Sequence, residues 1–277
     1  MPDPVLSNIQ GNVLGGFLKD HQVFLMLSIA DAAAAKSWIR QTACNEVATA
    51  DEVLDFNKLF KKLRQRRGEH AIVKCTWMNV AFTRRGLATL GVSVADLALL
   101  DPSFNANLAD QAKNVLGDAN ASAPANWRPP YRDQTVDTVI IVAADDRDDL
   151  DAQVEFFTGQ ATANGFELVG TESGKAREGE HRGHEHFGYK DGISQPRIQN
   201  FDDGGTLPPW LFLVDASVAA PTGAAATIAQ YPGQPVTPPA PAGPPQWAHE
   251  GSYLVFRRLR QLVPEFGDFV SSVMSRK

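Results

Sequence analysis

Two apolar, β-rich runs, each followed by a helical pattern, limit what this chain can fold into. The first run is His21 to Ile29, and Asp31 behind it is a plausible N-cap for an alanine-rich helix. The second is Asp137 to Ala144, the clearest strand pattern in the sequence. It precedes a helical segment from Asp145 to Phe157 whose N-terminal acids suit the helix dipole. Each run therefore predicts a β–α unit.

Further strands and helices complete the two units. Thr49 to Glu52 form a capping box, and the apolar residues after it recur at helical spacing. Ile72 to Phe82 predicts a buried strand, and Thr83 is expected to cap a short helix behind it. Phe166 to Val169 predicts the strand that closes the second unit.

The order of these elements indicates an α+β fold. Residues 101–136 are rich in Pro, Asn, Asp and Ala, which predicts a long connection with broken helical pieces. The order β–α–β, connection, β–α–β fits a split β–α–β (ferredoxin-like) sandwich, with helices covering one face of an antiparallel sheet. We expect this domain in residues 1–200, a Pro/Ala/Gly-rich linker in residues 201–250, and the first strand and helix of an incomplete, similar second domain in residues 251–277. A two-element piece cannot bury its own apolar face, so it is expected to pack on the first domain or on a partner.

The net charge and the cysteine content limit the kinds of partner and site that this chain is expected to have. A net charge of −6 and a pI of about 5.5 argue against a nucleic-acid partner, which would meet a basic face. The basic run from Lys58 to Arg67 is expected to be a solvated helix face. Cys44 and Cys75, the only two cysteines, form no Cys-x-x-Cys pair, so neither a disulfide framework nor a zinc ribbon is expected. The sequence shows no signal-peptide pattern and no apolar run of membrane-spanning length, which predicts no membrane partner and a cytoplasmic location.

One short motif points to chemistry. Residues 186–196 read His-Phe-Gly-Tyr-Lys-Asp-Gly-Ile-Ser-Gln-Pro and place the carboxylate of Asp191 in a turn near Gly188 and Gly192. Glycine adopts positive φ readily and has no Cβ, so a flat ligand could approach this backbone closely. Asp-Gly is also a common turn pair, so this segment alone leaves an ordinary surface turn open.

The same motif resembles the Gly-x-x-Asp-Gly signature of the dye-decolorizing (DyP-type) haem peroxidases. Asn8 to Leu14 (Asn-Ile-Gln-Gly-Asn-Val-Leu) resembles that family's N-terminal segment, and Gly251 to Gln261 resembles the first strand of its second domain. Tyr231 to Gln234 resembles the loop that precedes this strand. The likeness runs from about residue 8 to the C-terminus. It implies haem b as the cofactor, with hydrogen peroxide and an aromatic reductant as partners, for the oxidation of dyes and phenolic compounds.

The resemblance also implies roles for individual residues. Asp191 is expected to act as the acid–base group above the distal face of the haem, moving a proton between the two oxygens of peroxide. Arg258 is expected to reach the haem propionates, with Arg257 as the alternative, because alternation along a strand lets at most one of them face inward. The residues implied to bind the cofactor are Gly188, Gly192, Ile193, Ser194 and Arg258.

Alternatives remain open beside this assignment. In the family, the proximal histidine and the distal arginine lie beyond the segment that Gly251 to Gln261 resembles, so we expect the N-terminal portion of a peroxidase, working with a C-terminal half or as a homo-oligomer. No residue is assigned as a metal ligand. A rival hypothesis is a non-catalytic ferredoxin-like module that has lost haem ligation and acts as an assembly or partner subunit. His181, His184 and His186 could instead hold a small metal ion, although a polar loop is the ordinary explanation. His249 could ligate iron, but the family carries its ligand elsewhere.

Overall fold

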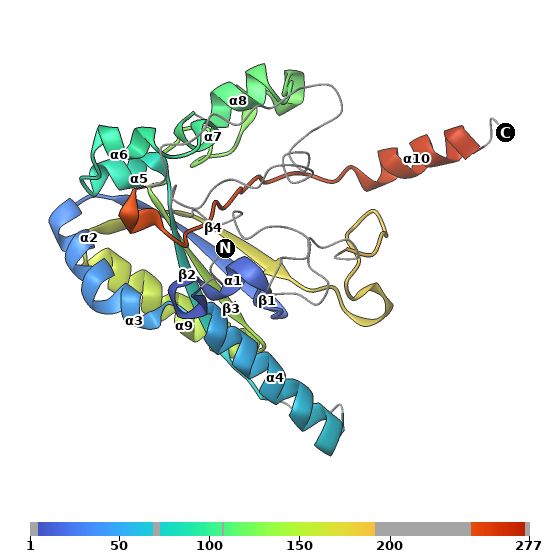
Figure 1. Cartoon of the computed structure of the whole chain (residues 1–277). Helices are drawn as coiled ribbons and strands as arrows, with labels where there is room; N and C mark the ends of the chain where they lie inside the picture. The colour runs from blue at the N-terminus through green and yellow to red at the C-terminus, as the bar shows by residue number, and fades with distance from the viewer. Residues whose placement is uncertain (1–4, 69–72, 107, 192–244, 275–277) are drawn as a thin grey trace, which may run out of the picture. The chain divides into compact units, whose positions relative to one another are not determined.

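The computed structural model describes residues 5–68, 73–106, 108–191 and 245–274, which fall into two compact units (Figure 1). The first unit comprises residues 1–174 and 208–253, and the second comprises residues 175–207 and 254–277. The predicted boundary at residue 200 and most of the predicted linker lie outside the described residues, so the domain boundaries stay a prediction. None of the helices that the structure describes is long and apolar enough to cross a bilayer.

A mainly antiparallel four-stranded sheet forms the centre of the first unit. Its strands, β1 (His21–Ile29), β2 (Thr76–Phe82), β3 (Thr138–Ala144) and β4 (Phe166–Lys175), lie in the order β2-β3-β1-β4. Strand β3 pairs antiparallel with both neighbours, so that Ile140 lies opposite Leu25 on one side and Val80 on the other. This order confirms the predicted α+β fold, because every pair of neighbouring strands combines one strand of the first β–α–β unit with one strand of the second.

The helices that the structure describes are α1 (Gly11–Leu14), α2 (Ala32–Trp38), α3 (Cys44–Glu46), α4 (Ala50–Arg67), α5 (Arg84–Thr89), α6 (Val94–Ala98), α7 (Pro102–Asn105), α8 (Leu108–Asn114), α9 (Arg147–Ala163) and α10 (Val263–Met274). Helices α2, α4, α5 and α9 lie in the order that the sequence predicts, and further short helices occur between them. A π-helical turn, residues 39–43, joins α2 to α3. The short helices α7 and α8 and two 3₁₀ turns occupy the predicted long connection.

Side-chain caps begin the main helices. The carboxylate of Asp31 accepts hydrogen bonds from the N–H groups of Ala33 and Ala34 at 2.9 and 3.1 Å, at the start of α2. At the start of α4, the carboxylate of Glu52 accepts from the N–H of Thr49 at 2.9 Å, as a capping box requires. These caps satisfy N–H groups that have no partner inside a helix, so local sequence fixes where the helices start.

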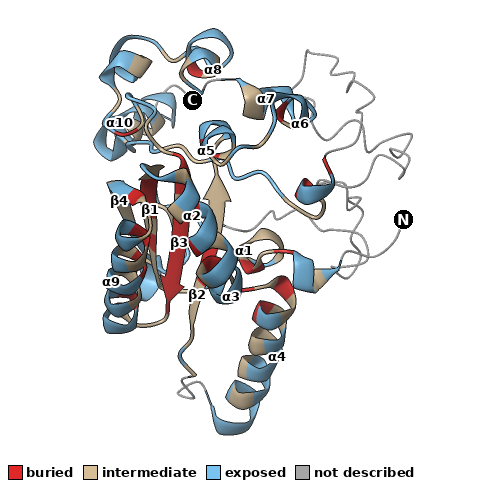
Figure 2. Cartoon of the chain, turned by 90° about the vertical axis from the view of Figure 1, so that its left-hand side faces the viewer, coloured by how far each residue is buried: buried red, intermediate tan, exposed pale blue. Residues whose placement is uncertain are grey.

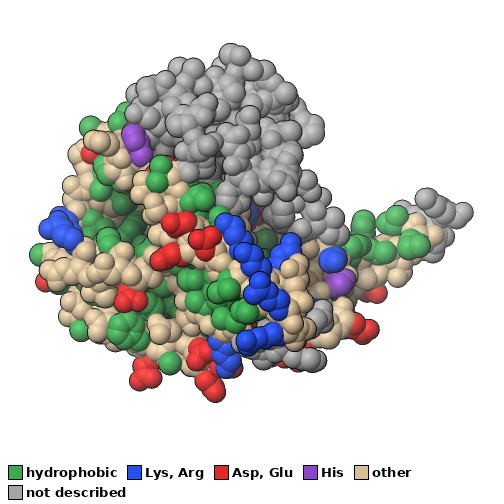
Figure 3. All heavy atoms as spheres, turned by 60° about the horizontal axis from the view of Figure 1, so that its bottom comes forward, with side chains coloured by type: hydrophobic (Ala, Val, Ile, Leu, Met, Phe, Trp, Pro, Cys, Tyr) green, Lys and Arg blue, Asp and Glu red, His purple; other side chains and the backbone are tan. Residues whose placement is uncertain are grey.

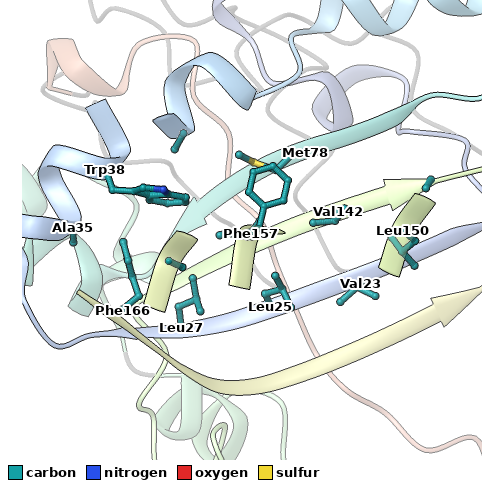
Figure 4. Close-up of a cluster of buried hydrophobic side chains, with 14 residues drawn as sticks. Val23, Leu25, Leu27, Ala35, Trp38, Met78, Val142, Leu150, Phe157 and Phe166 are labelled. Atoms are coloured by element: carbon teal, nitrogen blue, oxygen red, sulfur yellow. The ribbon is translucent and has the colours of Figure 1, made fainter. Parts of the chain in front are cut away.

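The main core lies between the sheet and helices α2 and α9. Phe157 of α9 and Trp38 of α2 gather with Leu25, Leu27 and Met78 in one buried cluster (Figure 4). Strand β3 is buried along nearly all of its length and β1 in its middle, whereas the outer part of α4 is exposed (Figure 2). Burial of this apolar area on one face supplies the main driving force for folding of the unit.

The second face of the sheet is covered as well, which goes beyond the sequence prediction of one covered face. Ile141 and Ala143 of β3 pack with Val53 of α4 and with Phe17. Consecutive residues of a strand point to opposite faces, so β3 is apolar on both. This explains why its sequence reads as an unbroken apolar run.

A buried cation joins α4 to this face. Lys19 forms an ion pair with Asp145, and its ammonium lies 4.5 Å from the ring centre of Phe56 and 5.7 Å from that of Trp77. The rings of Phe56 and Trp77 meet edge to face at 5.5 Å. The ion pair with Asp145 and the two ring contacts offset the free-energy cost of removing the Lys19 ammonium from water.

The basic run of the sequence lies on the exposed side of α4. All six of its cations are exposed to solvent, and Figure 3 shows Lys and Arg side chains gathered in a band on the face to which α4 points. They are Lys58, Lys61, Lys62, Arg64, Arg66 and Arg67. The predicted solvated face is confirmed.

The C-terminal segment differs from its prediction in one respect. Helix α10 forms within residues 251–277, where a helix was predicted, but the strand predicted over Gly251–Gln261 does not, since residues 251–262 are neither helix nor strand. A strand needs hydrogen bonds from a neighbouring strand, and the described sheet offers this segment no place. Residues up to Tyr253 instead pack with the first unit, where the Tyr253 hydroxyl accepts from the N–H of Asp101 at 2.8 Å.

Candidate functional site

The turn that carries Asp191 lies in the second unit and is a short antiparallel ladder. His184 and Lys190 form an isolated antiparallel bridge. One step further along, the N–H of Asp191 donates to the carbonyl of Gly183 at 2.8 Å. The backbone on either side of the loop is therefore paired, and Asp191 lies at the base of a closed turn.

The tip of this turn depends on a glycine. The N–H of Glu185 donates to the carbonyl of Tyr189 at 2.9 Å, and the N–H of Gly188 donates back to the carbonyl of Glu185 at 3.0 Å. Gly188 has φ +99°, a conformation that L side chains rarely adopt. A Cβ at Gly188 would find no heavy atom within 4 Å, so its surroundings are open. Backbone geometry, not crowding, requires glycine here.

A glutamate carboxylate lies inside the turn. Glu185 accepts hydrogen bonds from the N–H groups of Phe187 at 2.6 Å and Tyr189 at 2.8 Å, and from the side-chain amide of Gln261 at 2.5 Å. The side-chain oxygen of Gln261 in turn accepts from the N–H of His186 at 3.2 Å. Partial burial by itself raises the pKa of Glu185, but these hydrogen bonds, together with the nearby His186, hold the pKa below its usual value.

Contacts from elsewhere in the second unit brace the same turn. The Arg177 guanidinium donates to the carbonyl of Glu185 at 2.8 Å. The ring of Phe187 lies 4.6 Å from that of Phe266 in α10, and the ring of Tyr189 lies 6.1 Å from it at 78°. The segment around Asp191 is thus held by α10 and by the coil before it.

The structure places two of the three described candidate positions within this turn and the third elsewhere in the same unit. Asp191 and Gly188 are exposed at the turn. Arg258 is exposed in the coil of residues 251–262, whereas Arg257 beside it is half-buried. The remaining candidates, Gly192, Ile193 and Ser194, lie outside the described residues.

The histidines do not form a metal site in the structure. No group of three His, Cys, Asp or Glu side chains among the described residues is arranged to hold a metal ion. The ring of His184 contacts the carbonyl of Arg182 at 3.2 Å, and that of His181 lies 3.7 Å from Glu180. His249 lies in the first unit, at the end of a 3₁₀ turn.

Sequence reasoning missed Glu185 and Gln261. The partners of Glu185 are local, because it accepts the N–H groups of residues two and four positions ahead. Gln261 carries no local signal, since its partner is 76 residues away.

Comparison with known proteins adds independent findings. Residues 8–178 match the family described as the DyP dimeric alpha+beta barrel domain. The chain is 30% identical over 266 residues to dye-decolorizing peroxidase msp1 of Mycetinis scorodonius, covering 96% of this chain and 45% of that protein. Among solved structures, an ancestral D-type dye-decolorizing peroxidase matches with a TM-score of 0.75 and 30% identity, covering 98% of this chain and 53% of that one.

A dye-decolorizing peroxidase in complex with 2,6-dimethoxyphenol matches with a TM-score of 0.72 and 26% identity, over 97% of this chain and 52% of that one. The chain spans about half the length of the relatives and solved structures that it matches.

Proposed function

The chain belongs to the dye-decolorizing peroxidase family, and on that premise we propose that it takes part in the hydrogen-peroxide-dependent oxidation of dyes and phenolic compounds, with Asp191 as the acid–base group. The Asp191 turn carries this proposal, because it presents an exposed carboxylate at the end of a hydrogen-bonded turn. The match to peroxidases does not favour a non-catalytic module.

We propose that a haem group lies on the side of Asp191, and two observations on the described residues support this. The space around Gly188 is open, and Asp191 is exposed beside it in the sequence motif. Haem b, when bound, would supply the redox chemistry. We propose that Arg258 pairs with its propionates, as a guanidinium does with carboxylates, and that Gly188, Gly192, Ile193 and Ser194 line the porphyrin. The residue that ligates the iron would come from outside the described residues, from a C-terminal half or from a second copy of the chain.

The proton step is the one that Asp191 would perform. Cleavage of the O–O bond of hydrogen peroxide requires a proton to leave one oxygen and reach the other, which departs as water. The Asp191 carboxylate accepts the first proton and returns it to the departing oxygen, so the aspartate is regenerated. An aromatic reductant then supplies electrons, and the solved complex with 2,6-dimethoxyphenol supports a phenol in this role.

Substitution of Asp191 tests this role. Asp191→Asn keeps the size of the side chain but removes the base, so kcat/KM for peroxide is expected to fall by roughly 10²-fold or more. The assay follows 2,6-dimethoxyphenol oxidation by protein titrated with haemin, alone and with a relative's C-terminal half. Asp268→Asn is the matched control, because Asp268 is an exposed aspartate of α10 in the same unit. Full turnover by Asp191→Asn would contradict the proposal.

A reducing, cytoplasmic location is also proposed, on the basis that Cys44 and Cys75 are both free thiols. Disulfides persist in oxidising compartments. Labelling of both thiols in freshly lysed producing cells supports this location, and blocked thiols would argue against it.

A further inference from the structure

We propose that Glu185 is a positioning residue that holds the Asp191 turn in its working geometry. The inference rests on the proposed function for the role of Asp191, but the hold of Glu185 on the turn is a property of the chain itself. Glu185 lies six positions before Asp191 in the sequence, and in the ladder of the turn it pairs with Tyr189, two residues before Asp191.

The contacts of Glu185 within the turn lie at its tip, residues 185–189. Its two carboxylate oxygens accept the N–H groups of Phe187 and Tyr189, while its own N–H and carbonyl take part in the backbone bonds of the same turn. Hydrogen bonds to an ionised carboxylate are roughly twice as strong as those between neutral groups. Four groups of one residue thus fix a single loop conformation.

Hydrogen bonds of Gln261 connect the turn to the coil of residues 251–262, which is distant in the sequence. Its amide donates to Glu185 and its oxygen accepts from His186, so one side chain meets the turn through both of its polar atoms. The Arg177 guanidinium adds a bond to the Glu185 carbonyl. Glu185 is therefore the residue at which the ladder, the coil of residues 251–262 and Arg177 all meet.

These hydrogen bonds are important for the conformation of the turn because burial of apolar side chains contributes little to its stability. Among the described residues 175–191 none is buried, and the aromatic ring of Phe187 is only partly covered by Phe266. Polar contacts must then define where Asp191 lies. A displacement of about 1 Å of a reacting group can lower a rate by roughly 10²-fold.

Amide hydrogen exchange on the 277-residue chain tests the hold directly. Glu185→Ala removes both acceptors, so exchange at Phe187 and Tyr189 is expected to accelerate by about 10-fold or more, and Glu185→Gln, which keeps one acceptor oxygen, should restore part of the protection. Glu180→Ala is the matched control, because the Glu180 side chain is 87% exposed in the same segment. Unchanged exchange in Glu185→Ala would overturn the proposal.

A double-mutant cycle tests whether Glu185 acts through Asp191. In haem-loaded protein, Glu185→Ala is expected to lower kcat/KM for peroxide by roughly 10- to 100-fold and to leave KM for 2,6-dimethoxyphenol unchanged. The double variant with Asp191→Asn should be no worse than Asp191→Asn alone.

Each outcome of the cycle has a separate meaning. Losses that simply add would overturn the positioning role, since Glu185 would then act independently of Asp191. Full turnover by Asp191→Asn would instead refute the proposed function. The exchange experiment would still decide whether Glu185 holds the turn.

Discussion

Gly86 illustrates how a single residue can be fixed by its neighbours. It lies in α5, and a Cβ there would overlap the carbonyl oxygen of Asp137, a backbone atom of the segment entering β3. Backbone cannot turn aside as a flexible side chain can, so Gly86→Ala is expected to lower the free energy of unfolding by about 3 kcal/mol. Gly159 in α9 is the matched control, because a Cβ there meets no atom within 4 Å. Gly159→Ala should stabilise by about 0.5–1 kcal/mol, since alanine is the better helix former. Equal effects in urea unfolding would contradict this.

Some residues of the candidate site could be predicted from the local sequence, whereas others could not. Asp191 and Gly188 belong to one short motif, so their place in a turn follows from residues beside them. The contact of Glu185 with Gln261 depends on how distant parts of the chain meet, which no local pattern encodes. Arg258 lies in the same unit as the Asp191 turn, although the sequence was expected to place them in different domains, and it lies in a coil where a strand was expected.

Among the elements, α9 shows how one aspartate can serve both a cap and an ion pair. Asp146 accepts from the N–H of Asp148 at 2.9 Å and pairs with Lys74 at 2.9 Å. The hydrogen bond from Lys74 and those from the backbone lower the pKa of Asp146. Because the folded pKa is depressed, the stabilisation is complete above the unfolded pKa of about 3.9 and is lost as the pH falls through the folded value.

A pH series of unfolding measurements tests this element. Between about pH 5 and pH 2, wild type is expected to lose more stability than Asp146→Asn, which keeps a cap but cannot ionise. Lys74→Met should also reduce the acid sensitivity, because Lys74 is the largest cause of the pKa shift. Parallel stability curves for the three proteins over this range would contradict the assignment.

Element boundaries also show which signals are local. The strand from His21 to Ile29 forms over the residues predicted, and Thr83 caps α5 as expected. Both predictions succeed because strand alternation and helix capping depend on residues that are close together in the sequence. Strand β4 runs to Lys175, well beyond the predicted Val169, although its outer residues are polar. Pairing in the sheet, and not its own pattern, extends it.

For the first unit as a whole, stability depends on how the sheet packs against α2 and α9. Phe157 is 1% exposed within that core, whereas its neighbour Phe156 is 42% exposed. Phe157→Ala is expected to lower the free energy of unfolding by about 3–5 kcal/mol through lost burial and a cavity. Phe156→Ala, a chemically identical change, should cost clearly less. Thermal and urea unfolding check the difference, and similar losses for both variants would refute this placement of the core.

The hydrogen bond between Glu185 and Gln261 has a consequence for how the molecule is made. A growing chain cannot close this contact until 76 further residues have followed Glu185 out of the ribosome. At about 5–20 residues per second, that delay is roughly 4–15 s. The sheet of the first unit draws all its strands from residues before 176 and can assemble during that interval. The turn that carries Asp191 therefore gains its contact with Gln261 only after every strand of the sheet has been synthesised.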